Sequence, residues 1–278
     1  MKNYKLLILL FGFTLFVTSC KKEEETKDDT EETTQQLNKG EIVSDPAPSQ
    51  FTKKVLIEEF TGEWCGYCPD GAARIASIKQ NHQDLVFAIS YHDSDPFETP
   101  VTNLYEGLLN VPFFPSAAID RVPYQGDLSF SRSYWANVTN ERLAVTADMG
   151  IKLETHLTGN NLTVTVKLAA KQDHNDLYLT VALVEDNVPE SSPGAQSGAA
   201  AGYVHQDVLR NMVTDNRGDL VTLVANKVVA ITYDNINFNY RDINNIHVIA
   251  FLHEKVDTQG KEIYNVQGVK AGETHDFD

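Results

Sequence analysis

Two folded parts of different class are predicted by the sequence, an α/β domain at residues 51–144 and an all-β, sandwich-like domain at residues 145–278. Three observations lead to this prediction. An apolar run at residues 55–57 is followed, after a short turn, by two cysteines and a helix-forming segment. A continuous apolar run of strand length at residues 84–91 is typical of a buried parallel strand. From residue 144 onward, apolar and polar residues alternate between turn signals, which indicates antiparallel strands.

The N-terminus has the pattern of an export signal. A basic start, an apolar run at residues 6–17 and two small residues precede Cys20, which is the composition of a secretory signal peptide. The run is short for a membrane span of about 20 residues, so we expect residues 1–19 to be cleaved. The sequence VTSC resembles the lipobox of bacterial lipoproteins, and this resemblance implies that Cys20 becomes the lipid-bearing first residue.

An acidic segment follows the signal. Residues 20–50 are charged, rich in Thr and Gln and poor in large apolar side chains, so they cannot bury enough surface to fold, and we expect a disordered tether. The acids after Cys20 resemble the surface-export signal of Bacteroidetes lipoproteins, although a solubilising linker has the same composition. The net charge of −16 and the lack of a basic stripe argue against nucleic acid as a partner.

In the α/β domain we expect strands at residues 53–60, 84–91 and 117–119 and a hairpin at residues 120–126. We expect helices at residues 65–83 and 101–110 and a closing helix at residues 129–143. Cys65 and Cys68 lie between the first strand and its helix, where the partial positive charge of a helix N-terminus favours the thiolate. The thiolate is the nucleophile of thiol–disulfide exchange. A purely structural disulfide and half of a zinc site are the alternatives, but zinc needs two more ligands, and the sequence has no second C-x-x-C and no H-x-x-x-H. We therefore expect a redox-active Cys65–Cys68 disulfide, with no metal and no cofactor.

The strand–Trp–Cys–Gly–x–Cys–helix order resembles the thioredoxin superfamily, so the predicted fold is a thioredoxin-like domain followed by the β domain. The resemblance implies that Cys65 is the attacking thiolate and the more exposed cysteine, and that Cys68 is the resolving thiol. It also implies a cis-proline beside the disulfide. Pro115 fits this position because an apolar strand follows it directly, whereas Pro112 lies too far ahead.

Further residues of the expected site follow from the same resemblance. Glu59 aligns with the buried acid of thioredoxins and would act as general base toward Cys68. Because strand residues alternate faces, we expect one of the adjacent acids Glu58 and Glu59 to meet solvent. The expected client groove is bordered by Trp64, Tyr67 and Phe114. The Gly-Tyr pair between the cysteines is also found in periplasmic disulfide isomerases, whereas Phe114 departs from the small or branched residue usual before the cis-proline.

The β domain is predicted to contain about seven strands, which suggests an immunoglobulin-like sandwich. The clearest runs are at residues 145–157, 161–171, 177–185, 220–232, 247–254 and 262–270. Residues 189–202, rich in Gly, Ala and Ser, are expected to form a flexible loop. The sequence YVHQDVLR comes next; His205 and Arg210 in it are expected to pair inside the β domain, with a surface site as the alternative.

The lipoprotein signal, the acidic tether, CGYCP and YVHQDVLR together resemble the Bacteroidetes outer-membrane lipoprotein family named for a 28-kDa member. The leading hypothesis is a lipid-anchored thiol–disulfide oxidoreductase or isomerase of the cell envelope, at the periplasmic face or the cell surface. Its partners would be client protein thiols or disulfides and an unidentified envelope redox partner. The alternative is a surface binding or adhesion lipoprotein in which the thioredoxin-like domain is a scaffold.

Overall fold

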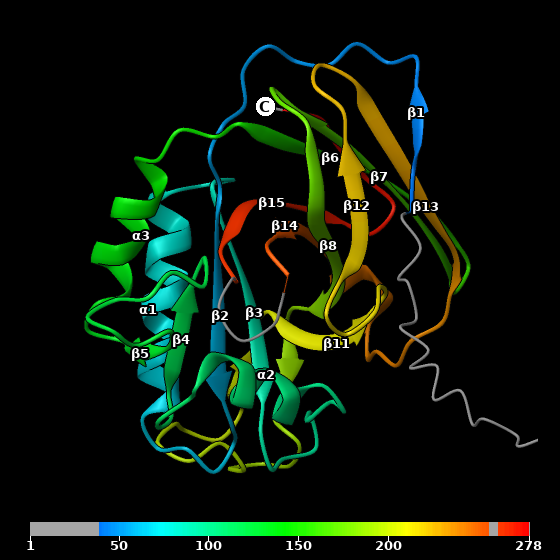
Figure 1. Ribbon diagram of the computed structural model, residues 1–278. Helices are drawn as coiled ribbons and strands as arrows, with labels where there is room; N and C mark the ends of the chain where they lie inside the picture. The colour runs from blue at the N-terminus through cyan, green and yellow to red at the C-terminus, as the bar shows by residue number, and fades with distance from the viewer. Residues whose placement is uncertain (1–38, 256–260, 278) are drawn as a thin grey trace, which may run out of the picture. The chain divides into compact units, whose positions relative to one another are not determined.

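The computed structural model describes residues 39–255 and 261–277 of the chain. The expected signal peptide, the lipidated Cys20 and most of the expected tether lie outside the described residues. Within them, no helix combines the length and the apolar character needed to cross a membrane. The described part is mostly β, with few helices and more than one sheet (Figure 1).

A nine-stranded mixed sheet positions the cysteines. Its strands are β2 (Val55–Thr61), β3 (Val86–His92), β4 (Ser116–Ile119), β5 (Phe130–Ser131), β8 (His174–Glu185), β11 (Val208–Met212), β12 (Asp219–Leu223), β14 (Ile246–His253) and β15 (Ile263–Lys270). They lie in the order β15-β14-β8-β11-β3-β2-β4-β5, and β12 also pairs with β8. β3 runs parallel to β2 on one side and to β11 on the other, whereas the remaining neighbours are antiparallel.

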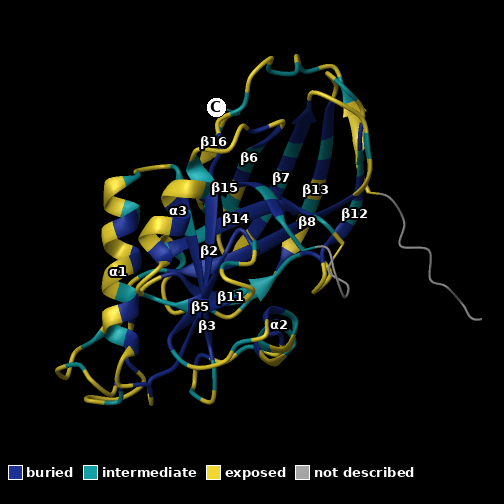
Figure 2. Ribbon diagram, turned by 60° about the vertical axis from the view of Figure 1, so that its left-hand side comes forward, coloured by how far each residue is buried: buried dark blue, intermediate teal, exposed yellow. Residues whose placement is uncertain are grey.

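Three helices accompany this sheet, α1 (Cys68–Asn81), α2 (Thr102–Leu109) and α3 (Trp135–Leu143). Parallel strands need a crossover connection, and α1 supplies it between β2 and β3. Ile75 and Ile78 of α1 and Trp135 of α3 pack in one cluster with Val55 and Ile57 of β2. The spacing of the buried residues along α1 leaves its opposite side to solvent (Figure 2).

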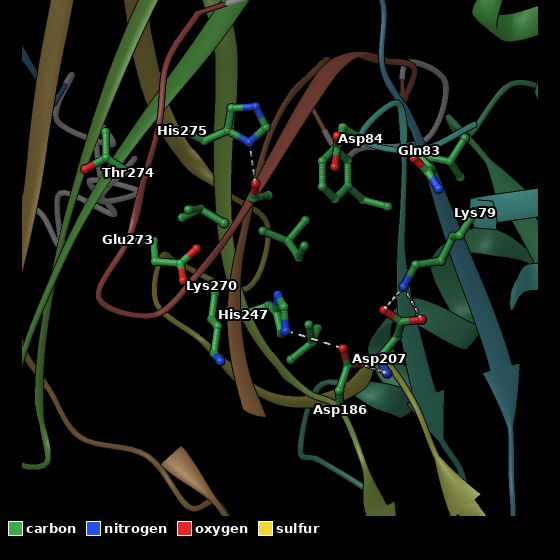
Figure 3. A pocket seen from close by; sticks show the side chains of 16 residues that line it. Lys79, Gln83, Asp84, Asp186, Asp207, His247, Lys270, Glu273, Thr274 and His275 are labelled. Atoms are coloured by element: carbon green, nitrogen blue, oxygen red, sulfur yellow. Dashed lines mark hydrogen bonds and ion pairs between the residues drawn. The ribbon is translucent and has the colours of Figure 1, made fainter. Parts of the chain in front are cut away.

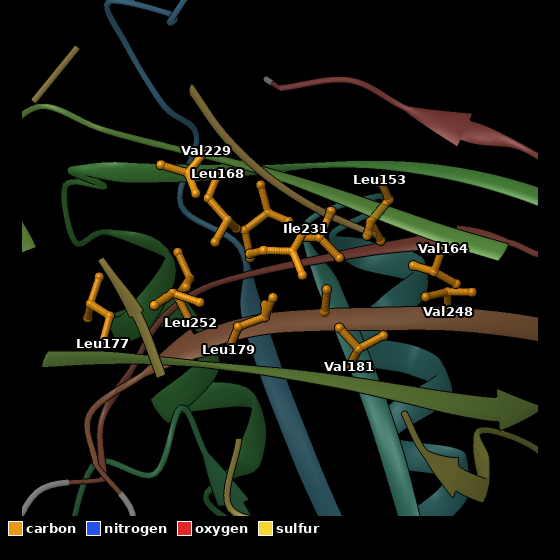
Figure 4. Packing of buried hydrophobic residues seen from close by; sticks show 14 of the residues in the cluster. Leu153, Val164, Leu168, Leu177, Leu179, Val181, Val229, Ile231, Val248 and Leu252 are labelled. Carbon is orange, nitrogen blue, oxygen red and sulfur yellow. The ribbon is translucent and has the colours of Figure 1, made fainter. Parts of the chain in front are cut away.

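A second sheet is wholly antiparallel. It consists of β1 (Glu41–Val43), β6 (Met149–Thr158), β7 (Asn161–Ala170), β13 (Val228–Ile236) and β16 (Thr274–His275), in the order β1-β13-β7-β6-β16. Leu168 and Ile231 of this sheet pack against Leu179, Val181 and Val248 of the first sheet (Figure 4). Burying each such side chain is worth roughly 1.5–3 kcal/mol, so this cluster holds the two sheets face to face. The remaining elements are β9 (Val188–Pro189), β10 (Val204–His205) and the 3₁₀ helix η1 (Ile243–Asn245).

Strands from both sides of residues 144/145, the expected domain boundary, share the nine-stranded sheet. One apolar cluster contains Leu56 and Phe60 of β2 together with Val184 of β8 and Phe251 of β14. The backbone N–H of Ile263 on β15 also donates to the carbonyl of Asp120, at 2.9 Å. The two parts therefore have a core in common.

Three local predictions need correction. Residues 41–43, expected in the tether, form β1 because they pair with Val228–Ala230 at the edge of β13. The run at residues 220–232 is two strands, β12 and β13, separated by a turn in which Asn226 has a φ of 58°. The closing helix begins only at Trp135, because Phe130 and Ser131 pair with β4 instead.

Candidate functional site

Cys65 and Cys68 form a disulfide, with a distance of 5.4 Å between their Cα atoms. A tight turn after β2 places them, in which the N–H of Cys65 donates to the carbonyl of Gly62 and the N–H of Cys68 to that of Cys65. Cys68 then begins α1, and the following Pro69 is tolerated because amides of the first turn have no intrahelical acceptor. Cys65 is 4% exposed and Cys68 2%, so the expected advantage of Cys65 in access is small in this oxidised state.

The peptide bond between Phe114 and Pro115 is cis, which confirms the choice of Pro115 over Pro112. Pro115 lies beside α1: a Cβ atom added to Gly71 would stand 3.1 Å from both Cβ and Cγ of Pro115. Gly71 is buried and follows Cys68 by three positions, on the same face of the helix. Pro115 is thus held close to the helical turn that carries Cys68.

The three expected groove residues lie at or near the surface. Trp64 is 49% exposed and Tyr67 is 70% exposed, whereas Phe114 is half-buried. The rings of Trp64 and Phe114 are in contact, with centroids 5.1 Å apart. The guanidinium of Arg132 lies 5.3 Å from the centroid of the Tyr67 ring. Trp64 and Tyr67 are thus each next to a cysteine in the chain, and Phe114 is in contact with the ring of Trp64.

Glu59 is 2% exposed and faces α1. Its Oε2 accepts a hydrogen bond from Ser90 Oγ at 3.2 Å, while Oε1 has no hydrogen-bond partner among the described residues. Oε1 lies only 2.8 Å from the position of a Cβ added to Gly71, in the turn that follows Cys68. Burial raises the pKa of Glu59 to about 8, opposed by the Ser90 hydrogen bond and assisted by the negative charge of Asp207. The carboxyl group is therefore mainly protonated at neutral pH.

The expectation that Glu58 or Glu59 meets solvent is wrong, because β2 is a central strand with both faces covered. Glu58, on the face opposite Glu59, forms two short hydrogen bonds with Arg121, at 2.6 and 2.8 Å. The hydroxyl of Tyr91 donates to the same carboxylate at 3.0 Å. Glu58 is thus fully paired, unlike its neighbour.

Between α1 and Glu59 lies a cavity of about 250 Å³, which Ser90, Lys79 and Asp207 also line together with apolar residues of α1; neither cysteine belongs to its lining. Lys79 Nζ bonds both carboxylate oxygens of Asp207, at 2.6 and 2.8 Å. The same ion pair borders a larger cavity of about 760 Å³, shown in Figure 3, whose lining does not include the cysteines. Lys79 and Asp207 were not expected from the sequence; the only signal was that Asp207 belongs to YVHQDVLR.

His205 lies on the cysteine side of the molecule. Its ring packs against those of His92, Phe97 and Tyr203, with centroids 4.9 to 5.2 Å away. Its Nε2 is 3.6 Å from a carboxylate oxygen of Glu63, two residues before Cys65. Burial lowers the pKa of His205 to about 4, assisted by repulsion from His92 and opposed by attraction to Glu63. The ring is therefore neutral at pH 7.

The expected internal pairing of YVHQDVLR holds for Arg210, which bonds Glu185 of β8 at 2.6 Å. It does not hold for His205, whose contacts link β10 to the loops around the cysteines. Among residues 39–255 and 261–277, no group of three or more His, Cys, Asp or Glu side chains has the arrangement of a metal site.

Comparison with known proteins identifies the family. The model of the family described as outer membrane protein Omp28 matches residues 102–275, which is more than half of the chain and begins after the cysteines. No curated protein matches the chain.

Three solved structures are similar. HBP35 of Porphyromonas gingivalis is 24% identical, with a TM-score of 0.71 over 81% of this chain and 77% of that chain. Protein AGR_C_4864 from Agrobacterium tumefaciens is 11% identical, with a TM-score of 0.54 over 83% of this chain and 99% of that one. A domain of the outer membrane lipoprotein Omp28 from Porphyromonas gingivalis is 23% identical over 45% of this chain and 89% of its own, with a TM-score of 0.31. The first two similarities concern the fold, whereas the family match establishes kinship: the chain belongs to the Omp28 family of outer membrane proteins and is located at the outer membrane.

Proposed function

We propose that the protein is a lipid-anchored thiol–disulfide oxidoreductase of the cell envelope, with Cys65 and Cys68 as its redox pair and Cys20 as its anchor. One observation carries the proposal. The disulfide lies at the N-terminus of α1, and the carboxyl oxygen of the buried Glu59 that has no partner among the described residues lies beside the next turn of that helix. A helix N-terminus stabilises a thiolate. A buried, protonated acid can exchange a proton with the thiol that leaves or attacks.

We further assign residues 51–144 to a thioredoxin-like unit and residues 145–278 to a β-sandwich unit that shares its sheet. The order β2, α1, β3, α2, β4, β5, α3 supports this assignment, as does the cis-proline directly ahead of β4. Trp64, Tyr67 and Phe114 then border the groove for a client polypeptide.

Starting from the disulfide, a client thiolate attacks Cys65 Sγ. The bond between the two Sγ atoms breaks, a mixed disulfide forms, and Cys68 leaves as a thiolate that takes the proton of Glu59. A second client thiolate then attacks the client sulfur of the mixed disulfide and releases Cys65 as a thiolate. The client has lost two electrons and formed a disulfide, and an envelope partner bearing its own disulfide reoxidises the pair. The same steps in reverse reduce a client disulfide.

The test compares two matched single-cysteine variants of the chain from residue 20, with Cys20→Ala in both. In Cys68→Ser, the resolving thiol is absent, so Cys65 is expected to accumulate mixed disulfides with oxidised glutathione and with envelope proteins. In Cys65→Ser, we expect little mixed disulfide, because Cys68 is assigned as the resolving thiol and is buried at the first residue of α1. Mass spectrometry of the intact protein reads out both. Equal labelling of the two variants would contradict the assigned roles.

A second function has one observation in its favour. The burial of both cysteines also suits a surface binding protein whose disulfide only stabilises the fold. The reduction potential of the wild-type pair separates the two functions. Catalytic pairs have potentials between about −120 and −270 mV, whereas structural disulfides lie below about −300 mV. A pair that is reduced only after the protein unfolds would rule out the oxidoreductase.

A further inference from the structure

Residues 190–202, which we call the strap, have a defined course over the cysteines, unlike the flexible loop expected from their composition. The strap closes around the carboxylate of Glu190, which accepts the backbone N–H groups of Gly194, Gln196 and Gly202 at 2.9, 3.1 and 2.6 Å. These hydrogen bonds, that of Gly202 first, lower the pKa of Glu190 to about 2. Charge-assisted bonds to the backbone thus fix the shape of a segment with few apolar side chains.

The strap lies directly on the loop that carries Cys65. The N–H of Ser197 donates to the carbonyl of Glu63 at 2.6 Å, and the side-chain amide of Gln196 donates to the carbonyl of Cys65 at 3.1 Å. The carboxylate of Glu63 in turn accepts hydrogen bonds from the N–H and the hydroxyl of Ser191. Three strap residues are therefore bonded to the two loop residues Glu63 and Cys65.

Gly198 shows how closely the two backbones approach. A Cβ atom added to Gly198 would stand 2.1 Å from the carbonyl oxygen of Gly66 and 2.8 Å from its carbonyl carbon. No side chain fits in that space. Gly66 lies between the two cysteines, so the strap meets the loop at the disulfide itself, and both cysteines are buried.

We propose that the strap is a gate on the redox site, and that a client polypeptide reacts with Cys65 only after the strap has moved off residues 63–66. The inference rests on the proposed function, because it concerns access to the same disulfide. The strap occupies the carbonyl groups of Glu63 and Cys65 that an extended client chain can use as acceptors. The client is thus an extended segment that replaces the strap's hydrogen bonds and presents a small residue to Gly66.

The composition of the strap suits such a movement. Ser191, Ser192 and Pro193 are exposed, and among its polar side chains Gln196 and Glu190 are buried. The strap is held by hydrogen bonds, which contribute modest net free energies. None of its residues belongs to the apolar clusters of the described part. It can therefore open locally while the cores stay packed.

Two glycines of the strap provide a matched test. Gly198 and Gly194 both have a φ of +79°, so alanine carries the same backbone strain at either position. At Gly194, however, an added Cβ meets nothing within 4 Å. Gly198→Ala pushes the strap off Gly66, whereas Gly194→Ala leaves the contact in place. The measured quantity is the rate at which dithiothreitol reduces the Cys65–Cys68 disulfide, in the chain from residue 20 with Cys20→Ala.

We expect Gly198→Ala to speed the reduction by about tenfold, the effect of losing one or two hydrogen bonds, and Gly194→Ala to change it by less than about twofold. Gln196→Ala, which removes the bond to the Cys65 carbonyl, should act in the same direction as Gly198→Ala. Equal rates for Gly198→Ala and the wild type would overturn the gate, and so would equal acceleration by both alanine variants. A thermal unfolding curve for each variant confirms that it is folded.

The experiments can contradict the gate and the proposed function independently of each other. Dithiothreitol is a small reductant, so its rate reports access to the disulfide whether or not the protein acts on clients. If Gly198→Ala is reduced faster but no variant exchanges with protein thiols, the strap does limit access to the disulfide, and the proposed oxidoreductase function is wrong. If the wild type exchanges with client proteins and Gly198→Ala is no faster with either reagent, the function stands and the gate falls.

Discussion

Among single residues, Glu59 has an environment that is costly for a charged group. Its carboxyl group is buried between β2 and α1, and one of its oxygens has no partner within the described part. Burying a charged group without a partner is unfavourable, so the group keeps its proton instead. Glu58, one position earlier, is buried to the same degree but is bonded to Arg121 and Tyr91. Two adjacent identical residues thus have different chemistry.

The pH dependence of stability tests this difference. The folded chain binds the proton of Glu59 with a pKa of about 8, against an ordinary glutamate pKa of 4.5 once the chain unfolds. Between these values the folded state holds more protons than the unfolded state. The free energy of unfolding therefore falls as pH rises, by up to about 1.4 kcal/mol per pH unit. Glu59→Gln keeps the side-chain shape but does not titrate.

We expect urea unfolding of Glu59→Gln to give a flatter dependence than the wild type between about pH 5 and 8. Other titrating groups contribute equally to both proteins, so the difference between the two curves isolates Glu59. It should grow in favour of the variant as pH rises. Parallel curves would show that Glu59 is ionised in the folded state at neutral pH.

Among the secondary-structure elements, α1 depends on a small residue at its first turns. Gly71 is buried where the helix passes Glu59 and Pro115. A side chain there meets Glu59 Oε1 at 2.8 Å and the Pro115 ring at 3.1 Å. The position of the helix that carries Cys68 is therefore set by the absence of a Cβ atom.

Gly107 in α2 provides the control for this position. It is exposed, and an added Cβ finds open space, so Gly107→Ala should stabilise the protein by up to about 1 kcal/mol, the usual gain of alanine in a helix. Gly71→Ala should instead destabilise it by about 1–3 kcal/mol, because a packed site has no room for an extra methyl group. Chemical denaturation measures both. Stabilisation by both substitutions would contradict the close packing of α1 on Glu59 and Pro115.

For the molecule as a whole, folding depends on the continuity of the nine-stranded sheet. β11 pairs in parallel with β3 through Val208 and Ser90, and it continues the sheet into β8 and β14. Without residues 145–278, β3 has an unpaired edge, and the cluster around Leu56 and Phe60 is open to water. Such an edge and such a surface favour aggregation over folding.

We therefore expect a fragment of residues 39–144 to remain unfolded or to aggregate, whereas residues 39–278 unfold in one cooperative transition. The measurement is circular dichroism with the dispersion of amide signals in an NMR spectrum, for the fragment and for the longer chain side by side. Addition of residues 145–278 in trans should restore dispersion to the fragment. A well-dispersed spectrum from the fragment alone would show that its core is self-sufficient.

Local pattern was enough to predict the strand and helix around the cysteines and most of the long strands. These features depend on residues within a few positions of one another, through apolar periodicity and helix-end chemistry. The cis bond at Pro115 was expected only from the resemblance to the thioredoxin superfamily. Predictions from local pattern fail where pairing with a distant strand intervenes, as at Phe130–Ser131, which form a strand rather than the start of a helix.

The rest came from contacts between distant parts of the chain. Gln196 bonds Cys65 from 131 positions away, Ser191 bonds Glu63 from 128, and Lys79 pairs with Asp207 from 128. Periodicity reports which face of an element is apolar, but it does not report what covers that face. Packing therefore decides three features: the burial of both Glu58 and Glu59, the strap over the disulfide and the insertion of β11 beside β3. Each arises where two distant segments pair, and the sequence of one segment does not identify the other.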